Sequence, residues 1–264
     1  AANIAASHLA DNDADPGMGD MVAAIVGRKG GAALLASALK GTAFRSPDVA
    51  KIALKAVRAS GQPADALVAA LTKAGDLDAP RKPPTDAEVK ALAADAVKTG
   101  DAARGERVYR RKELQCLACH AYAGAGGQVG PDLTSIGASA QPDYLVDSLL
   151  LPHKAIKEGF DVTRVVTADD KVLQGVKVRE ADGVLVLRTA EDKELAIPVK
   201  DVAERGKSTK SLMPEGLTDQ LTKQDFADLV KYLSELGKVG GNYAPSKARV
   251  VRRWQVIDAT SANL

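Results

Sequence analysis

The sequence predicts a mainly α-helical fold of about two domains, with one small antiparallel β module inserted into the second domain. The first observation is length, because 264 residues exceed the usual size of a single domain. The second is helical spacing of apolar side chains over residues 19–74, 85–120 and 222–236. The third is a change of pattern over residues 159–204, where short β-branched runs alternate with polar turns.

The composition limits the possible partners. Hydrophobic residues make up 45% of the chain and aromatic residues 3%, so the cores must be built from Ala, Val and Leu. A formal net charge of +2 does not indicate a general polyanion binder, and we expect no nucleic-acid partner. No apolar run is long enough to span a bilayer. The chain lacks an initial Met and a visible signal peptide, so we interpret it as a mature or excised piece of a longer precursor.

The first domain is expected over residues 1–79 as short helices separated by Gly and Pro turns. This pattern is typical of HEAT-like helical repeats, although no strict period is visible. The clearest helix start is Ser46-Pro47, with Ser46 as the N-cap and Pro47 at the first helical position. A helical spacer or cap is the simpler interpretation of this region, and a partner-docking surface is the alternative.

A linker and one helix are expected over residues 80–100. The Pro-rich stretch 79–84 resists helix formation, so a domain boundary is predicted there. Thr85 is followed three residues later by Glu88, which predicts a capping box at the start of the next helix. The second domain is then expected over residues 101–264.

The predicted β module within it covers about residues 159–204. Asp182-Gly183 is a strong hairpin signal, and the other gaps between strands are equally short and polar. No helix of normal length fits into such gaps, so the strands must be antiparallel. Four strands are expected, at 160–167, 172–179, 184–189 and 195–199.

The most specific motif is the C-x-x-C-H stretch at residues 116–120, the attachment signature of a c-type haem. Cys116 and Cys119 would lie on one helical turn and reach two vinyl groups on one edge of a porphyrin. His120 would then present its imidazole to the iron from one face. Both cysteines of the chain are in this motif, so none is left for a disulfide or another thiol site.

Three other interpretations of the motif remain open, and one of them is a chance match. A thioredoxin-like redox pair needs a βαβ context, whereas the flanking sequence is helical in pattern. A zinc site needs two further ligands, and His8 and His153 are the only other histidines. Haem attachment agrees best with the surrounding residues.

Residues after the motif have features that suit a haem pocket. The Gly-rich loop 124–130 allows tight folding against a flat ring, and the carbonyl of Pro131 can accept a hydrogen bond from the far nitrogen of His120. Met213, followed by Pro214, is a candidate sixth ligand of the iron. The simpler alternatives are an ordinary loop proline and a buried core methionine. His153 is a weaker ligand candidate, and a surface or hydrogen-bonded histidine is the more common situation.

Several pieces of the chain together resemble the class I cytochrome c family. These pieces are Gly105 with Tyr109, the motif 116–120, the Gly-Pro-x-Leu segment 130–133, Met213 with Pro214, and the helix end 231–233. The resemblance implies a class I cytochrome c fold and one covalently attached haem c. It also implies that His120 and Met213 are the axial ligands and that the Pro131 carbonyl holds His120.

The long insertion between His120 and Met213 departs from compact members of that family. In this respect the chain resembles the C-terminal haem-binding domain of large multidomain proteins of Planctomycetes and Verrucomicrobia. The resemblance covers about residues 90–257. Those proteins often place a sugar-dehydrogenase-like propeller and helical repeats ahead of the cytochrome. The resemblance therefore implies a dehydrogenase domain or protein as electron donor.

The expected function is single-electron transfer by one haem, without catalysis by this chain. The acceptor would be another cytochrome or an oxidase, and the protein would be periplasmic or otherwise exported, because bacteria attach haem c outside the cytoplasm. Two alternatives belong to other classes. If Met213 is not a ligand, the iron is five-coordinate and the protein is a gas sensor or peroxidase-like. In the second alternative, the helical and β modules make the protein a docking scaffold.

Overall fold

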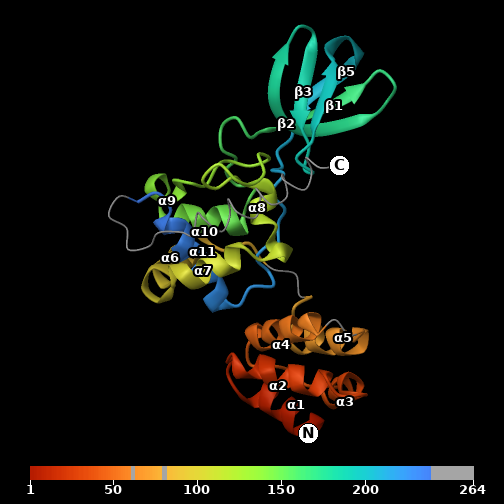
Figure 1. Cartoon of the computed structure of the whole chain (residues 1–264), viewed down its shortest axis with the longest axis vertical. Coiled ribbons are helices and arrows are strands. Elements are labelled where there is room, and N and C mark those ends of the chain that lie inside the picture. Colours follow the sequence, from red (N-terminus) through yellow and green to blue (C-terminus); the bar gives the residue numbers. More distant parts are fainter. Residues whose placement is uncertain (61–62, 79–81, 239–264) are drawn as a thin grey trace, which may run out of the picture. The chain divides into compact units, whose positions relative to one another are not determined.

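The computed structural model describes residues 1–60, 63–78 and 82–238 (Figure 1). Residues 79–81 of the predicted linker lie outside these ranges, as do residues 239–264. The chain divides into two compact units. The first is Ala1–Lys82 with Gln220–Lys223, and the second is Pro83–Asp219 with the chain from Gln224 onward.

All the regular secondary structure described in the first unit is helical. Its helices are α1 (Ala2–Asp11), α2 (Gly17–Val26), α3 (Gly31–Ala38), α4 (Pro47–Ala59) and α5 (Asp65–Ala74). Helix α2 packs on α4, and α3 packs on both α1 and α5, around fully buried aliphatic side chains such as Val22, Leu35 and Leu71. The predicted cap of α4 is confirmed, because the Ser46 hydroxyl accepts a hydrogen bond from the Asp48 amide at 3.2 Å.

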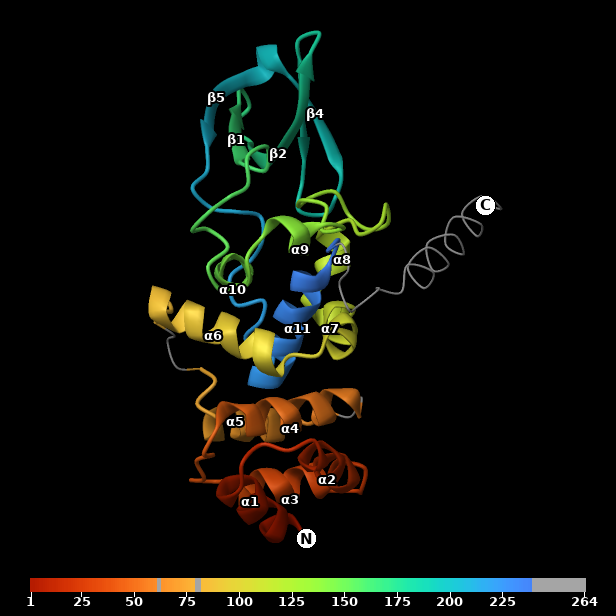
Figure 2. The same cartoon turned by 90° about the vertical axis from the view of Figure 1, so that its left-hand side faces the viewer.

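The second unit contains the candidate site and, outside its β module, seven described helices. They are α6 (Asp86–Thr99), α7 (Ala102–Tyr109), the short η1 (Lys112–Leu114), α8 (Cys116–Cys119), α9 (Ile136–Ser139), α10 (Pro142–Leu150) and α11 (Lys223–Glu235). The capping box predicted at the start of α6 is confirmed, since Thr85 and Glu88 exchange both of its hydrogen bonds. Figure 2 shows α11 crossing α7 close to α8.

The crossing of α7 and α11 is very close because Gly105 has no side chain. A Cβ at Gly105 would lie 1.9 Å from the carbonyl oxygen of Asp228, so no larger residue fits without moving a helix. One turn further, the rings of Tyr109 and Tyr232 meet in a tilted arrangement at a centroid distance of 5.4 Å. At the other end, the buried carboxylate of Asp228 accepts hydrogen bonds from the Arg104 guanidinium. These contacts fix α7, and with it the start of α8, against α11.

The β module is one antiparallel sheet with the strand order β4-β3-β2-β1-β5. Its strands are β1 (Val162–Thr167), β2 (Val172–Ala181), β3 (Val184–Arg188), β4 (Glu194–Pro198) and β5 (Val202–Lys207). The four predicted strands are present, and β5 was not predicted. Its sequence, Val-Ala-Glu-Arg-Gly-Lys, lacks an apolar alternation because its side chains are mostly exposed at the sheet edge. Only pairing with β1 defines it as a strand.

The two ends of the module meet. Thr163 of β1 pairs with Lys207 of β5, and the Ser208 amide donates to the Val162 carbonyl at 2.8 Å. The sheet has its own small core of Val165, Leu185, Leu187 and Ile197. The module therefore leaves and rejoins the helical part of its unit at one place, as Figure 1 shows.

The predicted fold class, a mainly α fold with a class I cytochrome c domain as its second part, is wrong. Of the described residues, 47% are helical and 15% lie in strands, and these strands form one five-stranded sheet with its own core. An antiparallel sheet combined with separate helices is an α+β arrangement. The sequence-based assignment treated the sheet as a minor insertion, because the pattern of β5 carried no strand signal and the size of the sheet was underestimated. Among the described residues, no helix is both long and apolar enough to cross a membrane.

Candidate functional site

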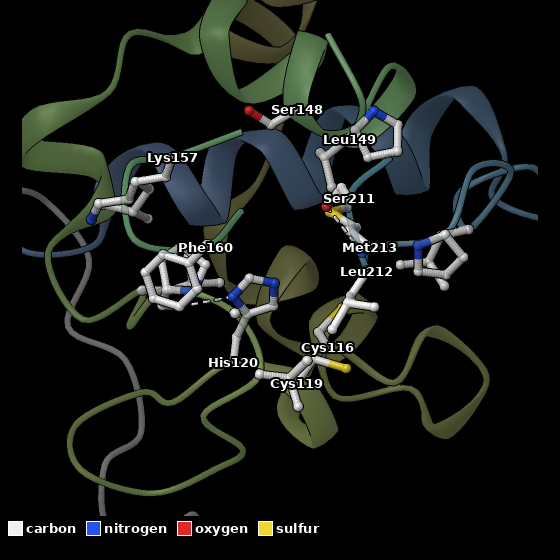
Figure 3. A pocket seen from close by; sticks show the side chains of 18 of the residues that line it. Cys116, Cys119, His120, Ser148, Leu149, Lys157, Phe160, Ser211, Leu212 and Met213 are labelled. Atoms are coloured by element: carbon white, nitrogen blue, oxygen red, sulfur yellow. Dashed lines mark hydrogen bonds between the residues drawn. The ribbon is translucent and has the colours of Figure 1, made fainter. Parts of the chain in front are cut away.

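All five predicted site residues line one cavity of about 300 Å³ in the second unit. Cys116 and Cys119 reach it from α8 and His120 from the residue directly after α8. Pro131 reaches it from the loop that follows, and Met213 from the segment between β5 and α11. Figure 3 shows these elements converging on the same space. The rest of the wall is mostly aliphatic and includes Leu114, Val129, Ile136, Leu145, Leu149 and Leu229.

The two cysteines lie on the single turn of α8, held by a hydrogen bond of 2.8 Å from the His120 amide to the Cys116 carbonyl. Both thiols are free. Burial raises the pKa of Cys116 to about 12. Burial, and secondarily the nearby Asp192 carboxylate, also raises the pKa of Cys119. The thiols are therefore protonated at neutral pH, which is the opposite of the lowered pKa of a thioredoxin-like redox pair.

The zinc interpretation gains no support from the described residues. In residues 1–60, 63–78 and 82–238 there is no cluster of three or more His, Cys, Asp or Glu side chains arranged to hold a metal ion. His153, one of the two other histidines, directs its Nδ1 to the Ser211 amide at 3.1 Å. It does not line the cavity that holds Cys116 and Cys119.

His120 is held in one orientation by its neighbours. Its Nδ1 lies 2.7 Å from the Pro131 carbonyl oxygen, and because a carbonyl only accepts, Nδ1 carries the proton and donates. Nε2 then carries the lone pair that a metal ligand needs. Burial lowers the pKa of His120 more than this hydrogen bond raises it, so the ring is neutral at physiological pH.

Gly130 contributes to the site in a way that the sequence analysis missed. A Cβ at this position would lie 2.5 Å from Cε1 of His120, so the backbone of residue 130 packs directly on the imidazole ring. Together with the Pro131 carbonyl, it leaves the ring little freedom to rotate. The signal was present in the sequence as a glycine directly before Pro131, but its partner was not visible there.

Met213 lies on a segment without helix or strand, and its amide donates to the Ser211 hydroxyl at 3.1 Å. Ser211 and Leu212 also line the cavity (Figure 3). The long insertion therefore does not take Met213 away from His120, because the two ends of the β module meet. The sheet contributes to the cavity as well, through Val176 of β2.

Residues 100–162 match the family model of cytochrome C oxidase, cbb3-type, subunit III. The matched part contains α7, the C-x-x-C-H turn and Pro131, and it ends before Met213. No curated protein matches the chain. The match supports a c-type cytochrome domain with a haem-binding, electron-transfer role. Domains of this kind are typically exported.

The residues present fit a haem group. The cavity lies in the size range of cofactor sites, and its walls are apolar as the faces of a porphyrin require. The available donors are a neutral imidazole oriented through its second nitrogen, a thioether and two thiols on one helical turn. Imidazole and thioether are the axial ligands typical of cytochromes c.

Proposed function

We propose that the second unit is a single-haem electron-transfer domain, with haem c attached through Cys116 and Cys119. His120 and Met213 are proposed as the two axial ligands, and Pro131 as the residue that orients His120. The observation that carries the proposal is the convergence of these residues, from three separate segments, on one apolar cavity. The family match to residues 100–162 supports the same assignment independently of Met213.

The haem, when bound, supplies a one-electron redox centre. The residues of the chain hold it and set its properties. The Pro131 carbonyl accepts from Nδ1 of His120 and so makes Nε2 a stronger donor. The aliphatic walls exclude water, and a thioether ligand favours a high reduction potential. With both axial positions filled there is no open site for substrate, which supports electron transfer in preference to catalysis.

The proposed electron donor is a dehydrogenase domain or protein, and the proposed acceptor is another cytochrome or an oxidase. The donor follows from the resemblance to multidomain haem-binding proteins. The acceptor is consistent with the matched family, which is a subunit of a cytochrome C oxidase. A periplasmic or otherwise exported location is part of the same proposal, since haem c is attached outside the bacterial cytoplasm.

Spectra of the haem-loaded protein and of Met213→Ala test this function. The wild type should be low-spin and show the weak near-infrared band of a thioether bound to ferric iron. Met213→Ala should keep its haem, lose that band and have a lower reduction potential. Met21→Ala, in the first unit and only partly buried, is the matched control and should resemble the wild type. A wild-type spectrum of five-coordinate, high-spin iron would contradict the proposal and favour a sensor or peroxidase-like protein.

A further inference from the structure

His153 stands at the end of α10, on a turn that is fixed by its neighbours. The amide of Leu151 donates to the Asp147 carbonyl at 2.7 Å, and the amide of Lys154 donates to the Leu151 carbonyl at 2.9 Å. The Lys154 ammonium also binds the Asp147 carboxylate at 2.8 Å. Pro152, immediately before His153, is buried and lines the cavity. Hydrogen bonds and an ion pair therefore tie the turn that carries His153 to the end of α10.

The imidazole of His153 contacts the Met213 segment on both sides of the methionine. Its Nδ1 accepts a hydrogen bond from the Ser211 amide at 3.1 Å. Because Nδ1 accepts, the ring proton lies on Nε2, which is 3.6 Å from a carboxylate oxygen of Glu215. That second distance is an electrostatic contact and too long for a hydrogen bond. Ser211 precedes Met213 by two residues, and Glu215 follows it by two.

A second hydrogen bond continues from Ser211 to the methionine itself. The Ser211 hydroxyl accepts from the Met213 amide at 3.1 Å, so two successive bonds connect the α10 turn with the backbone of Met213. Figure 3 shows the second of these bonds beside the cavity. Residues 208–222 form neither helix nor strand, so regular backbone pairing does not hold this segment in place. Side-chain contacts such as those of His153 must do so.

We infer that His153 is a positioning residue for Met213, holding the thioether at the cavity without touching the haem. This inference rests on the proposed function, in which Met213 is the sixth ligand. Methionine has three rotatable side-chain bonds, and a segment that moves freely would give the sulfur many positions away from the iron. By fixing the backbone at Ser211, His153 removes part of that freedom before the sulfur binds.

The experiment compares His153→Leu with His153→Asn in the haem-loaded protein. Asparagine places its amide oxygen one bond from Cγ, where histidine has Nδ1, so it can still accept from the Ser211 amide. Leucine has similar bulk and no acceptor. Two measurements are made on the ferric protein: the thioether–iron band, and the apparent affinity for added imidazole, which must displace Met213. Hydrogen exchange of the Ser211 amide is followed in parallel and needs no haem signal.

His153→Leu should keep its full haem content and bind imidazole about fivefold more tightly, which corresponds to about 1 kcal/mol for the lost hydrogen bond. Its Ser211 amide should exchange faster by a similar factor. His153→Asn should stay within about twofold of the wild type in both measurements. A structural role unrelated to Met213 would leave the imidazole affinity unchanged.

These measurements distinguish failure of the positioning role of His153 from failure of the proposed function. If the wild type shows the thioether–iron band but His153→Leu binds imidazole with the wild-type affinity, the positioning role is overturned and the proposed function stands. If His153→Asn weakens Met213 as much as His153→Leu does, the hydrogen bond is not the cause and the inference is again overturned. If the wild type lacks the band, and Met213→Ala binds imidazole as the wild type does, the sixth ligand and the inference both fall.

Discussion

Replacing Gly130 with alanine should disturb the candidate axial histidine without changing any ligand. The new Cβ would lie 2.5 Å from Cε1, 2.8 Å from Nδ1 and 2.9 Å from Nε2 of His120. Ordinary contacts between such atoms are about 3.5–4.0 Å, so the ring or the backbone must move by roughly 1 Å. Either movement breaks the 2.7 Å hydrogen bond between His120 and the Pro131 carbonyl.

The cost follows from two contributions. Overfilling a packed site costs about 1–3 kcal/mol, and the lost hydrogen bond about 1 kcal/mol. We therefore expect Gly130→Ala to lower the free energy of unfolding of the haem-loaded protein by about 2–4 kcal/mol. The reduction potential should change too, because the imidazole becomes a weaker donor once Nδ1–H loses its acceptor.

Denaturant unfolding and a potentiometric titration of Gly130→Ala measure both effects. Gly206→Ala is the matched control, because a Cβ at that position meets no atom within 4 Å and its φ is not positive. The control should have the stability and potential of the wild type. If Gly130→Ala is indistinguishable from Gly206→Ala in both measurements, Gly130 does not hold His120 and the reasoning is refuted.

Other predictions concern the supports of the site and its chemistry. Asp228→Ala should lower the free energy of unfolding by about 1–3 kcal/mol, because the buried carboxylate loses its hydrogen bonds from Arg104 and from the Asp101 amide. The loss stays in this range because Arg104 is half exposed and can bind water instead. Denaturant unfolding measures it. Replacing residues 162–207 with a short Gly/Ser linker should leave a folded, haem-loaded protein, since the ends of the module meet. The reduction potential should fall, because removal of Val176 opens the cavity wall to water. Failure of this variant to incorporate haem would contradict the prediction. In haem-free protein, alkylation of Cys116 should be slow at pH 8 and accelerate only toward its pKa of about 12. Because its pKa is raised, the Cys116 thiol binds its proton more tightly in the folded state than in the unfolded chain. The free energy of unfolding of the haem-free protein should therefore decrease as pH rises from about 9 to about 12. A free energy of unfolding that does not change over this pH range would argue against burial of the thiol. Reduction by the native donor should depend only weakly on ionic strength in stopped-flow measurements, because the charged residues that line the cavity are Glu113 and Lys157, which have opposite signs. A steep decrease of the rate with salt would indicate a charged docking patch.

The local features of the chain were predictable because their causes are local. The caps at Ser46 and Thr85 each depend on residues within three positions, and both were confirmed. The C-x-x-C-H motif needs only one helical turn to place two thiols and an imidazole together. The four apolar strands were recognised from their alternation, whereas β5 was missed because an exposed edge strand has no apolar face to reveal it.

The candidate site was predictable in its residues but not in its geometry. Cys116, Cys119, His120, Pro131 and Met213 were all selected from the sequence, and all line one cavity. Their roles as haem ligands and supports stay predictions until the spectra are measured. Two further contributions were invisible in the sequence: the packing of Gly130 on His120, and the hydrogen bond from the Ser211 amide to His153 across 58 positions.

The sequence by itself determined the chemistry on offer: two thiols, an imidazole and a thioether, set among aliphatic residues. Tertiary structure alone decided that this chemistry meets in one place. It did so because β5 pairs with β1 and places the end of the inserted module beside its start, which returns the chain to the helices just before Met213. Tertiary structure also decided the fold class, since strands pair with partners that can be distant in the chain. The charged edge strand β5 forms a strand only because β1 lies beside it.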